Sequence, residues 1–60
     1  MPKQMDEAES RAAIAAVIAE VGATSIKDMG KVMGALKERY AGQMDFGKAS
    51  AAIKDALSGK

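Results

Sequence analysis

The sequence has 60 residues, of which 48% are hydrophobic, and a formal net charge of +1. This length allows one small domain at most. The chain contains no cysteine and no histidine, which excludes disulfides, zinc sites of the Cys/His type and nucleophile–histidine pairs. We therefore predict a core built from apolar packing alone, with no catalytic residue, no metal site and no cofactor.

The first predicted helix covers residues 6–21 and follows a lead-in over residues 1–5 that we expect to be extended. Asp6 can cap this helix, with Glu9 as its capping-box partner three residues later. Large apolar residues then follow the spacing of one helical face, at Ile14, Val17, Ile18 and Val21. Gly22 stands where helices commonly end in a left-handed residue.

The second predicted helix covers residues 26–41, opening at Ser25 with Asp28 at the capping-box position and ending at Gly42. Its apolar residues make one continuous stripe at helical spacing, formed by Met29, Val32, Met33, Leu36 and Tyr40. Such a stripe is typical of a helix that packs one face against a core.

Gly30 and Gly34 lie inside this second helix, where each costs about 1 kcal/mol relative to alanine. They are one turn apart and share a face, so another backbone or a nucleic-acid phosphate can come close to them. Helix–helix packing within a small bundle is the interpretation that the sequence favours, and phosphate contact is the alternative.

The third predicted helix covers residues 46–58, with Asp45 as its cap and Gly59 at its end. Met44 and Ala49 are placed to form a hydrophobic staple across this cap. The predicted core face consists of Phe46, Ala49, Ile53, Ala56 and Leu57.

Three capped helices with short connections predict an all-α fold, a small three-helix bundle that forms a single domain over residues 1–60. The longest apolar run, residues 12–19, is far shorter than the roughly 20 residues that cross a bilayer. We expect no membrane association and a cytoplasmic location.

Charge is distributed unevenly along the chain. Residues 1–22 carry two basic and four acidic residues, a balance of −2, and residues 23–44 carry four basic and two acidic residues, a balance of +2. Residues 45–60 hold three basic and two acidic residues, a balance of +1. The basic excess is centred on the second helix, where lysines beside glycines can receive phosphates. A solvated basic face without a ligand is the alternative.

A family resemblance rests on residues 25–36, Ser-Ile-Lys-Asp-Met-Gly-Lys-Val-Met-Gly-Ala-Leu. This stretch closely resembles the C-terminal domain of the GatB/YqeY family. The similarity continues backwards through residues 18–24, and residues 2–5 are similar to the segment that precedes the domain. Asp45, Ile53 and Leu57 fit its last helix, so the resemblance covers essentially the whole chain.

The resemblance implies an all-helical module. In the B subunit of glutamine-dependent tRNA amidotransferases this module engages the tRNA body, and a similar module is appended to some glutaminyl-tRNA synthetases. Stand-alone YqeY proteins carry it behind an N-terminal helical domain. The family motif falls on Lys27, Gly30, Lys31 and Gly34, which agrees with the basic face of the second helix.

We therefore expect a non-catalytic accessory domain that binds tRNA or another structured RNA. The predicted contact residues are Lys27, Gly30, Lys31, Gly34, Lys37 and Arg39. Two alternatives stay open. The domain could dock on a protein partner, such as a missing N-terminal helical domain or a tRNA-processing enzyme. It could also belong to an amidotransferase assembly, a carbon–nitrogen ligase with glutamine as amido donor, without chemistry of its own.

Overall fold

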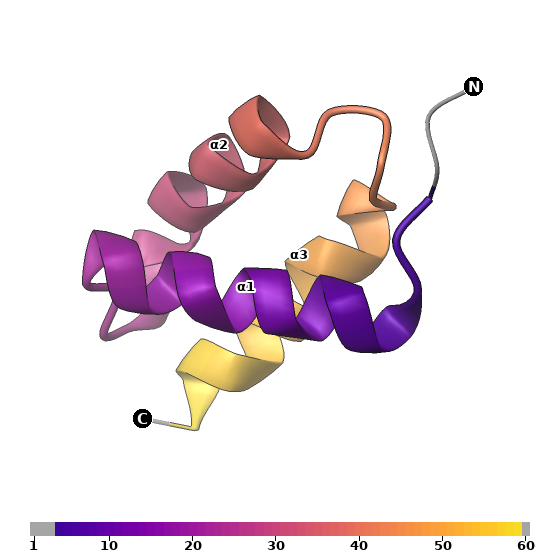
Figure 1. Cartoon of the computed structure of the whole chain (residues 1–60). Coiled ribbons are helices and arrows are strands. Elements are labelled where there is room, and N and C mark those ends of the chain that lie inside the picture. The colour runs from indigo at the N-terminus through magenta and orange to yellow at the C-terminus, as the bar shows by residue number, and fades with distance from the viewer. Residues whose placement is uncertain (1–3, 60) are drawn as a thin grey trace.

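A computed structural model describes residues 4–59 of the chain, which form three α-helices and one short 3₁₀ turn. These elements are α1 (Glu7–Val21), η1 (Ile26–Asp28), α2 (Met29–Arg39) and α3 (Phe46–Ser58) (Figure 1). The predicted all-α three-helix bundle is confirmed. Positions 1–3 of the predicted lead-in lie outside the described residues.

Both ends of α1 have the local structure that the sequence predicts. The backbone N–H of Glu9 donates to Asp6 Oδ1 at 2.7 Å, and the N–H of Asp6 donates to Glu9 Oε1 at 3.0 Å. Gly22 follows the helix with φ 69°, in the left-handed region. The capping box therefore satisfies two backbone donors that the first turn would otherwise leave unpaired.

The second helical segment begins differently from the prediction, because its first turn is a 3₁₀ turn and α2 proper starts at Met29. The N–H of Asp28 donates to the Ser25 carbonyl at 2.9 Å, which is the tight three-residue spacing. Asp28 Oδ2 in turn accepts from the N–H groups of Thr24 at 3.0 Å and Ser25 at 3.3 Å. The Asp28 carboxylate thus holds the backbone of Thr24 and Ser25 against the 3₁₀ turn.

α2 also ends earlier than the predicted residue 41, at Arg39. The chain leaves it through a turn in which the N–H of Gln43 donates to the Tyr40 carbonyl at 3.0 Å. Gly42 occupies this turn with φ 75°. Its left-handed conformation therefore serves the connection to α3 and does not cap α2.

The third helix has the predicted bounds and cap. Asp45 Oδ1 accepts from the backbone N–H groups of Gly47 at 2.9 Å and Lys48 at 3.2 Å. The predicted core face is largely buried, with one correction: Ala56 is exposed, whereas Ala49, Ile53 and Leu57 are buried and Phe46 is half-buried. Gly59 closes the helix at φ −83°, outside the left-handed region.

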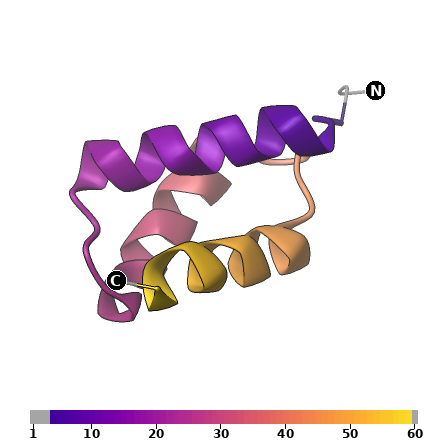
Figure 2. The ribbon, with the colours of Figure 1, turned by 90° about the horizontal axis from the view of Figure 1, so that it is seen from below.

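The three helices pack around a small aliphatic core. Its fully buried large side chains are Val17, Val32, Leu36, Ile53 and Leu57. α2 packs against both other helices, and α1 and α3 contact each other over a shorter stretch. In Figure 2, α1 and α3 run in roughly the same direction, with α2 behind them and running the opposite way, and Figure 1 shows that α3 crosses behind α1 at an oblique angle. Within residues 4–59, no helix combines the length and the hydropathy that crossing a bilayer would take.

The segment before α1 is fastened to the turn between α2 and α3. The N–H of Met5 donates to the Gln43 carbonyl at 2.8 Å, and Gln4 Nε2 donates to the Gly42 carbonyl at 2.9 Å. The turn carbonyls thus gain partners from a segment almost 40 residues earlier, which closes this end of the bundle.

Candidate nucleic-acid interface

Gly30 and Gly34 lie on the solvent side of α2. The burial of Val32 and Leu36, both with no exposed surface, fixes which face of the helix points inward. Both glycines are exposed, and a Cβ atom added to either would meet no atom within 4 Å. The favoured interpretation, that these glycines allow helix–helix packing inside the bundle, is therefore wrong. They face open space, where a partner's backbone can approach the helix closely.

Three of the predicted contact lysines surround the two glycines. Lys27 lies on η1, Lys31 in the first turn of α2 and Lys37 towards its end, and all three are exposed. Among residues 4–59, none of the three forms an ion pair within 4.0 Å. Their ammonium groups are therefore available to an anionic ligand.

Asp28 directly follows Lys27 in sequence, and its carboxylate is engaged by the backbone. The N–H groups of Thr24 and then Ser25 are the main cause that holds the pKa of Asp28 below its ordinary value. Lys31 and Lys27 lower this pKa further, by a smaller amount. Asp28 thus anchors the turn that carries Lys27 and is held ionised chiefly by neutral donors.

Arg39 is placed apart from the lysines, at the contact between α2 and α1. Its guanidinium makes a bidentate ion pair with Glu20 of α1, with Nη1 at 2.6 Å from Oε2 and Nη2 at 2.8 Å from Oε1. This pairing lowers the pKa of Glu20 and raises the pKa of Arg39. The structure therefore gathers five of the six predicted contact residues on one surface, and it gives Arg39 an intramolecular role.

We call the surface formed by Lys27, Gly30, Lys31, Gly34 and Lys37 the lysine–glycine face. Ile26 borders this face with 43% of its surface exposed. Ile26 lies on η1, before the first residue of α2.

The acidic residues at the start of α1 are engaged in local structure. Asp6 and Glu9 cap each other's backbone, and Glu7 accepts from Arg11 Nη2 at 2.9 Å. Within the described part of the chain, no three acidic side chains converge in a way that could hold a metal ion.

Comparison with known proteins identifies the family. Residues 1–57 match the family described as Yqey-like protein. No curated protein matches the chain. The match spans nearly the whole sequence, including the lysine–glycine face and all three helices, and it confirms the family that the sequence motif indicated. The chain belongs to the YqeY-like protein family.

Proposed function

We propose that this domain binds structured RNA through the lysine–glycine face of α2 and performs no chemistry of its own. The observation that carries the proposal is the open space over Gly30 and Gly34, flanked by lysines without intramolecular ion pairs. Two glycines inside a short helix cost stability. No packing contact inside the bundle offsets this loss of stability, because a Cβ atom at either glycine would meet no atom within 4 Å. A ligand that approaches the helix backbone closely would offset it.

The chemistry of the face suits phosphates better than bases. Lysine ammonium groups contact phosphate oxygens as point charges without reading sequence. Single-stranded RNA is usually held by stacking on exposed aromatic rings. The chain has only one tyrosine and one phenylalanine, and Tyr40 and Phe46 are both half-buried outside α2. A folded RNA with a regular phosphate backbone is therefore the expected ligand.

Transfer RNA is the RNA that the family resemblance implies, in the setting of an amidotransferase or a glutaminyl-tRNA synthetase. In such an assembly this domain would be a cytoplasmic accessory that holds the RNA while another chain or domain supplies the reaction. The absence of cysteine and histidine from the sequence supports a role in binding.

The test is a salt titration of binding to unmodified tRNA, with a duplex RNA of equal length alongside. Binding should weaken as salt rises, because each phosphate contact releases counterions. The charge reversal Lys27→Glu with Lys31→Glu should reduce affinity and lower the slope of log K against log salt by about 2, one for each lost contact. The matched control is Lys48→Glu with Lys54→Glu on α3, which changes net charge by the same amount.

Equal weakening by both double variants would mean that only net charge matters, and it would remove α2 as the contact surface. No binding to tRNA or duplex RNA at low salt, by folded protein, would overturn the proposal. Helical circular dichroism of each variant establishes folding, and all four lysines are exposed, so no large loss of stability is expected.

A further inference from the structure

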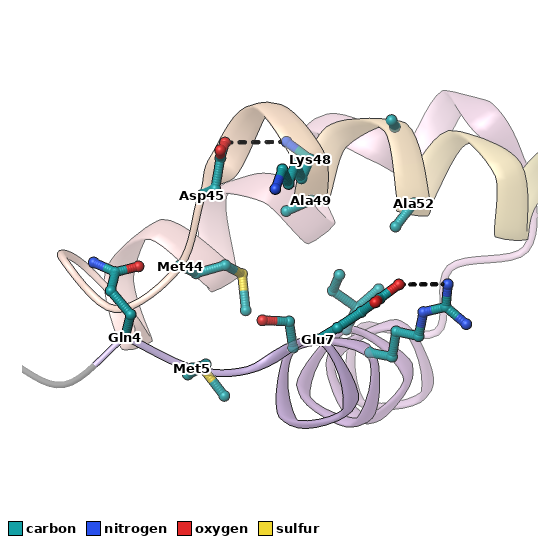
Figure 3. A pocket seen from close by; sticks show the side chains of 12 residues that line it. Gln4, Met5, Glu7, Met44, Asp45, Lys48, Ala49 and Ala52 are labelled. Carbon is teal, nitrogen blue, oxygen red and sulfur yellow. Dashed lines mark hydrogen bonds and ion pairs between the residues drawn. The ribbon is translucent and has the colours of Figure 1, made fainter.

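The carboxylates of this chain fall into two groups, those with a partner and those without. Most of them accept hydrogen bonds from the backbone or from arginine, namely Asp6, Glu7, Glu9, Glu20, Asp28 and Asp45. Figure 3 shows two of them, Glu7 and Asp45, with their hydrogen bonds as dashed lines. Within residues 4–59, the carboxylates of Glu38 and Asp55 have no such partner.

The fold gives Glu38 neither a partner nor a favourable position. The residues three and four places before and after it are alanines and glycines, at 34–35 and 41–42, so no basic side chain can pair with it at helical spacing. Its neighbour Arg39 is already paired with Glu20. Glu38 also lies in the last turn of α2, where a negative charge meets the negative end of the helix dipole. Nothing in the bundle therefore accounts for an exposed glutamate at this position.

The position of Glu38 on α2 connects it to the lysine–glycine face. Gly30, Gly34 and Glu38 follow one another at intervals of four residues, which places them in one row along the helix. At 1.5 Å per residue, this row is roughly 12 Å long. Lys31 stands two turns before Glu38 on the same side. Among the side chains of α2, Glu38 is the only one that carries an oxygen.

We propose that Glu38 accepts a hydrogen bond from a ribose 2′-hydroxyl group when the lysine–glycine face binds the minor groove of an A-form RNA helix. This inference rests on the proposed RNA-binding function and names the RNA structure and the sugar group that the face recognises. A carboxylate repels phosphate oxygens, so it contacts RNA favourably only at a hydrogen-bond donor. The minor groove of an A-form helix is wide and shallow and displays the 2′-hydroxyls.

The other members of the face fit such a groove. Gly30 and Gly34 add no side chain to the row, and the space over them is open, so the helix backbone can come close to a shallow groove floor. Lys27, Lys31 and Lys37 are exposed beside this row, and their ammonium groups suit the phosphates at the groove edges. DNA lacks the 2′-hydroxyl, so the contact with Glu38 favours RNA over DNA.

The experiment compares a short RNA duplex with a 2′-fluoro duplex of the same sequence. The 2′-fluoro duplex keeps the phosphates and base edges, but its 2′ position cannot donate a hydrogen bond. Fluorescence anisotropy at low salt gives the ratio of the two affinities for the unsubstituted chain, Glu38→Ala, Glu38→Gln and the matched control Asp55→Ala. Asp55 is exposed on α3, and its carboxylate also lacks a partner within residues 4–59. Each alanine variant removes one negative charge, so a general change in attraction cancels in the ratio.

We expect the unsubstituted chain and Asp55→Ala to bind the RNA duplex about tenfold more tightly than the 2′-fluoro duplex, because a hydrogen bond to a carboxylate is a strong one. Glu38→Gln keeps an acceptor oxygen without the charge and should retain a preference of about threefold. Glu38→Ala has no acceptor, so it should bind the two duplexes about equally. An unchanged preference in Glu38→Ala, or no preference in the unsubstituted chain, overturns the inference.

Failure of this inference and failure of the proposed function give different results. If tRNA binding depends on Lys27 and Lys31 but the affinity ratio does not depend on Glu38, only the inference is wrong. The same holds if tRNA binds and the RNA duplex does not. If folded protein binds neither RNA at low salt, both are wrong. Circular dichroism establishes folding, and alanine is a good helix former at an exposed position.

Discussion

The helices α1 and α2 both bury one face in the same core, but they do so with different residues. α2 buries Val32 and Leu36 completely and leaves glycine and lysine on its outer side. α1 buries only Ala13, Ile14 and Val17, and most of its outer side is alanine. Both are helices of one small bundle, yet the solvent side of α2 carries lysines around two glycines, whereas that of α1 mixes alanines with three glutamates and one arginine.

The comparison teaches that two helices of one bundle can bury similar core faces and still present different chemistry to solvent. Lysines around a glycine pair favour a polyanion that approaches the helix backbone. The exposed alanines of α1 stand among glutamates and one arginine and form no such cationic cluster. The bundle between them separates the two surfaces, so each can be altered without touching the other.

The largest expected effect comes from a substitution in the core between α2 and the other two helices. Leu36→Ala should lower the free energy of unfolding by about 2–5 kcal/mol, because it removes a fully buried side chain and leaves a cavity. A domain of this size has a total stability of about 3–9 kcal/mol, so a large fraction of molecules should be unfolded. Urea denaturation followed by circular dichroism measures this change.

The control for Leu36→Ala is Ala16→Gln on the exposed side of α1. A surface substitution to a good helix former should change the free energy of unfolding by less than about 0.5 kcal/mol. If the two variants were equally destabilised, α1 and α2 would not differ in burial as described.

The next effect concerns the end of α1. Gly22→Ala should destabilise the domain by about 1–2 kcal/mol, because Gly22 has φ 69° and a Cβ atom in the left-handed region clashes with the backbone. Gly22→Asn should cost less, since asparagine tolerates this conformation. Thermal unfolding of the two variants side by side tests whether the cost comes from the backbone conformation.

For the glycines of α2, we expect substitution by alanine to increase stability, in contrast to Gly22→Ala. Gly30→Ala and Gly34→Ala should each stabilise the domain by about 1 kcal/mol, because alanine is the better helix former and its Cβ meets no atom within 4 Å. The same substitutions should weaken RNA binding if the ligand approaches the helix backbone closely. Melting curves and tRNA titrations on the same samples separate the two effects.

A more stable Gly34→Ala variant with unchanged RNA affinity would show that phosphates do not approach the helix at this position. A destabilised variant would mean that the glycine packs against something after all. Either result would sharpen the contrast between the open face of α2 and the alanine face of α1.

The smallest effect concerns the ion pair that joins the two helices. Arg39 lowers the pKa of Glu20 in the folded state, so the unfolded chain binds a proton more readily. The resulting stabilisation is fully present above the ordinary glutamate pKa and is lost as pH falls through the lower, folded value. Glu20→Gln should therefore lower the unfolding midpoint slightly at pH 7, and its difference from the unsubstituted chain should disappear as pH falls below the ordinary glutamate value of 4.5.

Unfolding midpoints measured between acidic and neutral pH check this prediction. Glu38→Gln is the matched control, because Glu38 is an exposed glutamate next to Arg39 in sequence that forms no ion pair within the described residues. A parallel pH profile for both variants would contradict the role given to Glu20.

Local patterns in the sequence determined the ends of α1 and the start of α3. Asp6 with Glu9, Gly22 and Asp45 act through hydrogen bonds or dihedral angles within a few residues, so no distant contact is needed to place them. The stripe with Val32 and Leu36 also follows from spacing alone. The family motif indicated the lysines and glycines of α2 before their surroundings were known.

Tertiary structure decided what those residues face. Spacing puts Gly30 and Gly34 on one side of a helix, but only the docking of α1 and α3 on the opposite side leaves them open. The pairing of Arg39 with Glu20 joins residues 19 positions apart, and no local pattern encodes it. In the same way, alanines at separate places in α1 and α3 become one groove only when the bundle brings these helices together. Hydrogen bonds within a turn are fixed by neighbours in sequence, whereas exposure depends on which other helix occupies the space.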